Sequence, residues 1–114
     1  MAAGQYNISI EQGSTWSLRL SIDSEVGVDK NLNGYSTACK IGKSYYDPAP
    51  ISMTTAWVLQ QSGIFTISLS AAQTAALDAA HEYVYDVEIT DASGVVTRMI
   101  QGRATVSAGI TSWA

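Results

Sequence analysis

Two stretches of strictly alternating apolar and polar residues limit the folds open to this chain. The first covers residues 65–69 (FTISL) and the second covers residues 83–89 (YVYDVEI). Because successive side chains of a β-strand point to opposite faces, each stretch predicts a strand with one apolar and one polar face. Residues 6–10, 16–22 and 35–41 show the same alternation. Residues 95–106 form the last expected strand, where a shift of the alternation near Gln101 and Gly102 predicts a β-bulge. The chain is therefore expected to be all-β, with the apolar faces of two sheets packed together.

One short helix is expected between these two strands, over about residues 71–78. Ser70 and Gln73 have the spacing of a capping box, and the run AAQTAALDAA consists mostly of strong helix formers. Seven or eight strands separated by turns predict an immunoglobulin-like or Greek-key β-sandwich. Residues 1–106 are expected to form this single domain. Residues 107–114 are expected to form a tail.

Charged residues are scarce. They make up 14% of the chain, and hydrophobic residues make up 46%, against a usual charged share of roughly 25%. A surface with few charges can pack closely against another protein, because few ions must lose their water. An ordinary stable β domain is the alternative interpretation of the same composition.

The charges and the single cysteine argue against several classes of protein. Six Lys and Arg residues stand against ten Asp and Glu residues, for a net charge of −4, and the cations form no run. No nucleic-acid partner is expected, since phosphates require clustered cations. Cys39 has no cysteine to pair with and is expected to be a buried, reduced thiol. Neither a signal peptide nor an apolar run of about 18 residues is present. The chain is therefore expected to fold in a cytoplasm and to have no membrane partner.

Residues 29–34 match the opening of a calcium-binding loop. Asp29, Asn31 and Asn33 stand at alternate positions and Gly34 follows. The closing glutamate of such a loop would fall at Lys40, and the flanking segments are expected to be strands. A turn rich in Asn and Gly is the alternative interpretation. No other metal site and no cofactor is expected.

No set of catalytic residues is found. His81, the one histidine, lies beside Glu82 with no nucleophile to activate, and an exposed histidine in a turn is expected. Asp86 and Glu88 fall on the same face of one strand, whereas glycoside hydrolysis needs two acids across a cleft. They are expected to lie on a solvated or interface face, with Arg98 and Arg103 as partners. The chain is not expected to be an enzyme.

Four residues are candidates for contacts with other proteins. Tyr45 and Tyr46 lie in a loop with two prolines, which suits either stacking against a ligand or capping the sandwich. Together with Trp57 they would form the aromatic surface of a carbohydrate-binding module, an alternative of another class. Ile110 and Trp113 give the tail two large apolar side chains, which either fold back on the domain or dock on a neighbouring subunit.

A series of short motifs resembles a known family. The motifs are IEQGSTWSLRL at 10–20, VD at 28–29, NGY at 33–35, TACKI at 37–41, GIFTISLSAAQTAAL at 63–77, YVYDVEITD at 83–91, GVVTR at 94–98 and QGRATVS at 101–107. In these motifs the chain is similar to the small immunoglobulin-like proteins of tailed bacteriophages and to the N-terminal domain of phage baseplate upper proteins. The resemblance covers nearly the whole chain.

The resemblance implies a structural subunit of the virion, present in many copies and assembled in the cytoplasm of a bacterial host. Its partners would be other virion proteins, and its role would be an adaptor that anchors tail-fibre, baseplate or neck components. Capsid decoration, or cementing, is the alternative within the same class. No fibre or trimerisation stem follows the domain in this sequence, which leaves connector, neck and decoration roles open.

Overall fold

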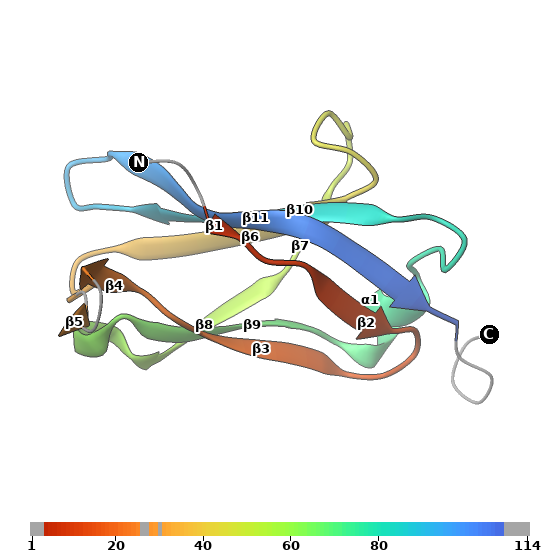
Figure 1. The fold of residues 1–114 in the computed structure, drawn as a ribbon, viewed down its shortest axis with the longest axis horizontal. Helices are drawn as coiled ribbons and strands as arrows, with labels where there is room; N and C mark the ends of the chain where they lie inside the picture. The colour runs from red at the N-terminus through yellow and green to blue at the C-terminus, as the bar shows by residue number, and fades with distance from the viewer. Residues whose placement is uncertain (1–3, 26–27, 30, 109–114) are drawn as a thin grey trace.

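Two open β-sheets face each other in the computed structural model, which describes residues 4–25, 28–29 and 31–108 (Figure 1). The larger sheet, sheet A, has the strand order β1-β11-β10-β6-β7, and β2 pairs with β11. Its strands are β1 (Gly4–Gln5), β2 (Ile8–Glu11), β6 (Ser36–Gly42), β7 (Ile51–Ser52), β10 (Tyr83–Thr90) and β11 (Val96–Ser107). The predicted all-β class and its two facing sheets are confirmed.

The smaller sheet, sheet B, has the order β3-β9-β8, with β3 (Trp16–Ser21), β9 (Ile64–Leu69) and β8 (Thr54–Leu59). A short 3-10 helix, η1 (Gln60–Ser62), connects β8 to β9. Eleven strands are assigned within the described residues, and seven of them have four or more residues. The predicted seven or eight strands correspond to these longer elements. The additional strands have only two or three residues.

The core lies between the sheets and consists mainly of the apolar positions of the alternating stretches. Phe65, Ile67 and Leu69 of β9 are buried to 1% exposure or less, and they face the equally buried Tyr85 and Val87 of β10. The other buried apolar residues are Ile8, Ile10, Leu20, Ile22, Leu32, Cys39, Ile41, Met53, Leu77, Tyr83, Ile89, Ala104 and Val106. One buried set comes from each sheet, as expected for a sandwich.

The N-terminal segment pairs with the last strand in parallel. Gly4 lies opposite Ile100 in β1, and Ile8 lies opposite Ala104 in β2. Between these two strands, the Tyr6 N–H donates to the Gln101 carbonyl at 3.0 Å and Tyr6 leaves the apolar face, with half of its surface exposed. The expected first strand over residues 6–10 is therefore wrong at Tyr6, because the segment is interrupted where it passes Gly102.

A β-bulge in β11 accounts for the change in its alternation. Val87 pairs with Ile100 and Glu88 pairs with Arg98, so Met99 is the extra residue. The sequence suggests a bulge near residues 101–102, two positions away. Gly102 has a separate role, because a Cβ at this position would overlap the Tyr6 carbonyl group. The N-terminal segment can approach β11 this closely only next to a glycine.

The helix α1 (Ala71–Ala75) begins as predicted and ends earlier. The capping box is confirmed: Ser70 Oγ accepts from the Gln73 N–H at 3.2 Å, and Gln73 Oε1 accepts from the Ser70 N–H at 2.9 Å. The expected end near residue 78 is wrong. Leu77 turns into the core, and the Asp78 N–H donates to the Tyr83 hydroxyl at 2.8 Å, so the backbone leaves the helix to reach β10.

Two further boundaries differ from the sequence prediction. The expected loop over residues 23–34 contains a small antiparallel pair, β4 (Asp23–Glu25) and β5 (Val28–Asp29). Its residues do not alternate, so the sequence gives no strand signal there. Ser107, expected to open the tail, is the last residue of β11, where it pairs with Glu11.

Candidate interaction surfaces

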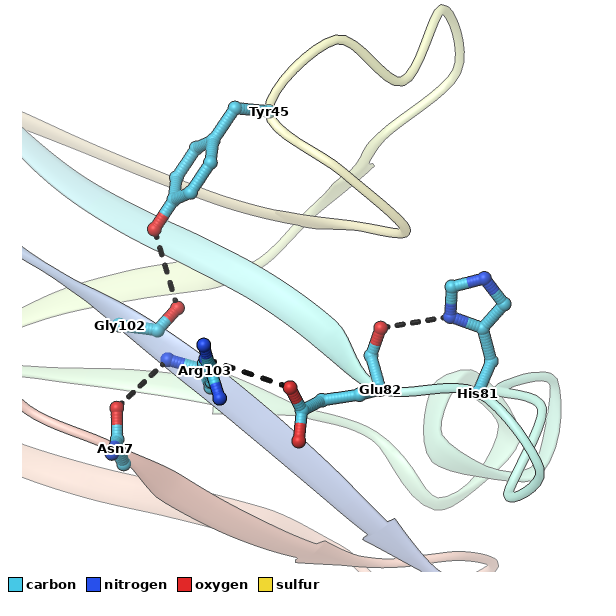
Figure 2. A network of polar contacts seen from close by, with 6 residues as sticks. All are labelled: Asn7, Tyr45, His81, Glu82, Gly102 and Arg103. Atoms are coloured by element: carbon cyan, nitrogen blue, oxygen red, sulfur yellow. Dashed lines mark hydrogen bonds and ion pairs between the residues drawn. The ribbon is translucent and has the colours of Figure 1, made fainter.

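The loop of residues 43–50, here called the tyrosine loop, projects from the outer side of sheet A (Figure 1). Its two tyrosines have different environments. Tyr45 points down onto the sheet, where its hydroxyl donates to the Gly102 carbonyl at 3.4 Å, and half of its surface is exposed (Figure 2). Tyr46 is 94% exposed. Tyr46 is thus an aromatic side chain presented to the surroundings.

Asp47 holds this loop in shape. Its carboxylate accepts from the backbone N–H groups of Lys43 and Ala49, both at 2.9 Å, and its own N–H donates to the Ser44 carbonyl at 3.1 Å. The two N–H donors lower the pKa of the Asp47 carboxyl below its ordinary value. The loop is therefore organised before any partner arrives, which reduces the entropy lost on binding.

A cavity of about 250 Å³ lies under Tyr45, against the outer face of sheet A. Lys40, Asp86 and Glu88 project into its lining from β6 and β10, and Asp47 and Pro50 contribute from the loop. Of these charges, Asp86 already pairs with Arg98, whose Nε lies 3.2 Å from Asp86 Oδ2. The cavity is small, and its lining is about equally polar and apolar.

The outer face of sheet A carries charged residues on its central strands β6, β10 and β11. Lys40 lies opposite Asp86 in the register, and Glu88 lies opposite Arg98. Arg103 Nε lies 3.6 Å from Glu82 Oε1, as Figure 2 shows. The expected pairing of the arginines with the acids of this face is thus confirmed for Arg98 with Asp86, whereas Arg103 takes Glu82 as its partner.

The outer face of sheet B is different in character, and we call it the serine-threonine face. The register aligns Ser17 with Ser68 and Thr54, and it aligns Arg19 with Thr66 and Ala56. Ser21, Ile64 and Leu59, which lies opposite Ile64 and is 44% exposed, share the same face. Arg19 is its one charged residue. The low charge of this face agrees with the composition, and a protein partner packing here would have only one ion to strip of water. Its use as an interaction surface stays a prediction.

Trp57 does not join the two tyrosines. Its ring meets the ring of Phe65 edge-on, with 5.6 Å between the centroids, and it packs against the core of the sandwich. Tyr45 lies on the outer side of sheet A. The flat aromatic surface expected for a carbohydrate-binding module is therefore not formed by Tyr45, Tyr46 and Trp57 together.

His81 and Cys39 have the environments expected of them. His81 is exposed in the turn before β10, and its Nδ1 lies 2.8 Å from the Glu82 carbonyl oxygen (Figure 2). Cys39 is a buried free thiol whose Sγ contacts Met53 Sδ at 3.2 Å. Burial, together with the charge of Asp86, raises the pKa of Cys39 to about 12, so the thiol stays protonated at neutral pH.

The calcium candidate is described only in part. Asn31 Oδ1 accepts from the Asn33 N–H at 2.9 Å, which closes a turn within the loop. Asp29 belongs to β5, and its side chain lies outside the description. Within the described residues, no group of three or more His, Cys, Asp or Glu side chains has the arrangement of a metal site. Calcium binding by Asp29, Asn31 and Asn33 stays a prediction.

Ile110 and Trp113 lie outside the described residues, so the proposed docking of the tail also stays a prediction. No helix in the described part of the chain has both the length and the apolar character to cross a membrane.

Two structural residues escape the sequence analysis. Thr74 is completely buried; its Oγ1 accepts from the Gly13 N–H at 3.0 Å and donates to the Ser14 carbonyl at 2.8 Å, which ties α1 to the turn between β2 and β3. Tyr83 fixes the corner between α1 and β10 through Asp78. A tyrosine at the start of an alternating strand, a few residues after a helix, is the only sequence signal for the second. Thr74 has none.

No family model matches the sequence, and the search of curated proteins finds no match.

Proposed function

We propose that this chain is a structural subunit of a tailed-bacteriophage virion, a multi-copy adaptor that anchors tail-fibre, baseplate or neck components. The family assignment comes from the motifs that resemble the phage proteins, which extend over nearly the whole chain. The observation that carries the adhesive role is the serine-threonine face, where Arg19 is the one charged residue of sheet B's outer surface. The exposed Tyr46 on its ordered loop offers a second contact.

The proposal includes an immunoglobulin-like topology. The order β3-β9-β8 corresponds to strands B, E and D of that fold, and β6-β10-β11 corresponds to C, F and G. Tyr83, at the start of the F-like strand, contacts the Asp78 backbone as a tyrosine corner does. These two features support the immunoglobulin-like assignment over other Greek-key sandwiches.

Capsid decoration is the alternative within the same class, because the same surfaces would serve a cementing subunit. A carbohydrate-binding module is the alternative of another class. The packing of Trp57 against Phe65 weighs against it, since only Tyr45 and Tyr46 of the three candidate aromatic residues lie in the tyrosine loop.

The test is the composition of purified phage particles. We expect mass spectrometry to detect the chain in stoichiometric amounts and cryo-electron microscopy to place it at the tail, the baseplate or the neck. Density over the capsid surface would favour the decoration alternative. Particles that lack the chain altogether would refute the proposal.

A variant of the tyrosine loop tests the surface itself. Tyr46→Ala removes an aromatic ring that is 94% exposed, so the isolated protein should keep its fold and its thermal stability. Incorporation into particles should fall if this ring contacts a neighbour. Ser36→Ala, at an exposed position of β6, is the matched control and should assemble normally. Equal incorporation of both variants would remove Tyr46 from the interface.

A further inference from the structure

Strand β3 is an edge of sheet B, and half of its backbone groups point away from the sheet. β3 pairs with β9 from Trp16 opposite Leu69 to Ser21 opposite Ile64. Just beyond it, the Ile22 N–H donates to the Gly63 carbonyl at 2.9 Å. Bonded and non-bonded positions alternate in an antiparallel pair. The N–H and C=O groups of Ser17, Arg19 and Ser21 therefore point to the open side, and they meet no other strand within the described residues.

An apolar groove of about 400 Å³ runs beside this open edge. Leu18 and Leu20 of β3 line one side, and Tyr6 and Ile100 of sheet A line the other. The groove lies between the two layers, where the inward-facing side chains of one more strand in sheet B would point. The edge and the groove thus provide the two things that an added strand requires, backbone partners and pockets for alternate side chains.

The charge at this edge specifies the added strand further. Arg19 is exposed, lies between Leu18 and Leu20, and makes no ion pair within the described part of the chain. A residue placed opposite Arg19 would share the outer face of the sheet with it, whereas its two neighbours would point into the groove. An acidic residue flanked by two apolar residues complements this pattern.

We propose that β3 binds an extended segment of a partner protein, which adds to sheet B as a fourth strand. The segment carries an acidic side chain opposite Arg19 and apolar side chains on either side of it, which enter the groove. This inference rests on the proposed function, because it names β3 as the strand through which the adaptor would attach to its partner. The two can fail separately, because particle composition tests the adaptor role and a peptide assay tests the edge.

The probe is a synthetic peptide of alternating valine and threonine with one central glutamate. Saturating peptide should slow hydrogen exchange of the Ser17, Arg19 and Ser21 amides by about tenfold or more, because each gains a carbonyl acceptor. A peptide with lysine in place of the glutamate should bind more weakly, and Arg19→Glu should reverse that preference. Failure of the glutamate peptide to bind, or identical behaviour of both peptides with both proteins, would overturn the proposal.

Two proline variants provide a matched pair. Ser17→Pro removes one outward N–H of β3, and proline is tolerated where an edge strand's N–H faces solvent. Thr55→Pro does the same on β8, since Thr55 lies opposite Ile67, whose backbone groups face β3. Peptide binding should be lost in the first variant and kept in the second, with both folded by circular dichroism. Protection of the Thr55 amide in place of the β3 amides would put the peptide on β8. Protection of the β3 amides in the protein alone would indicate self-association. Either result would refute the inference.

Discussion

The Tyr85 hydroxyl donates a hydrogen bond to the Tyr6 backbone carbonyl, although 79 residues separate the two. Tyr85 belongs to β10, in the middle of sheet A, and Tyr6 lies between β1 and β2 at the edge of the same sheet. The bond passes across β11 at Gly102, which pairs with Tyr85 and has no side chain to block it. Tyr85, Gly102 and Tyr6 thus form one unit that attaches the N-terminal segment to the sheet.

Tyr85→Phe should lower the free energy of unfolding by about 1–2 kcal/mol, because the Tyr6 carbonyl loses its side-chain donor while the ring stays in the core. Urea denaturation monitored by circular dichroism measures this. Tyr46→Phe, at a ring that is 94% exposed, is the control and should leave stability unchanged. Equal stability of the two variants would mean that the hydrogen bond contributes nothing.

Gly102→Ala should destabilise the protein by about 1–3 kcal/mol, the usual effect of overpacking. The new Cβ would lie 2.7 Å from the Tyr6 carbonyl carbon and nearer still to its oxygen, so the N-terminal segment must move. Gly4→Ala, on the same seam, is a matched control. Its Cβ meets only the Met99 carbonyl oxygen, at an ordinary 3.6 Å. Comparable losses in both variants would show that the close approach at Gly102 is not the cause.

Thr74→Val should cost about 1–3 kcal/mol, although the two side chains have similar volumes. Valine keeps the shape of the buried side chain but leaves the Gly13 N–H and the Ser14 carbonyl without their partner. Thermal unfolding measures the loss. Thr105→Val, at an exposed position of β11, should change stability little. A fully stable Thr74→Val protein would indicate that solvent replaces the missing hydroxyl.

Stability should fall in alkali, from about pH 9 to pH 12. Burial raises the pKa of Cys39 from 9.0 to about 12 and the pKa of Tyr85 from 10.0 to about 12. The unfolded chain therefore releases these protons first, so stability is complete below the unfolded pKa values and is lost as the pH rises through the folded ones. The urea midpoint measured from pH 8 to pH 12 should show this decline.

The alkaline decline should be shallower in Tyr85→Phe and in Cys39→Ala, each of which removes one of the two groups. A midpoint that rises with pH, or a decline that is unchanged in both variants, would contradict the assignment. In the native protein at neutral pH, thiol reagents should also react slowly with Cys39, because the buried thiol is protonated.

The strands that alternate strictly could be predicted from the sequence because their signal is local. Residues 65–69 and 83–89 place their apolar side chains inward in the structure as the pattern requires. The capping box at Ser70 is equally local and was equally predictable. The boundaries that fail are set by distant contacts. Tyr6 leaves the apolar face because it passes Gly102, and α1 stops early because Asp78 meets Tyr83.

The residue types of the candidate surfaces could be predicted from the sequence, but their positions in the fold could not. The composition of residues 43–50 suggests a contact loop. The sequence does not show that Tyr45 reaches Gly102 while Tyr46 stays exposed, because this depends on how Asp47 holds the loop over sheet A. Likewise, the sequence shows that Ser17 and Thr66 are polar. It does not show that Arg19 is the only ion beside them or that β3 is an edge, since both depend on strand order.

The parallel pairing of the N-terminal segment with β11 also affects biosynthesis. Asn7 accepts a hydrogen bond from Arg103, which the ribosome adds 96 positions later. During translation, the apolar side chains of Ile8 and Ile10 therefore stay exposed until β11 has been synthesised. Pairing between segments so far apart in the sequence slows folding and leaves a nascent chain prone to aggregation. A permuted gene that places β2 directly after β11 should shorten this delay.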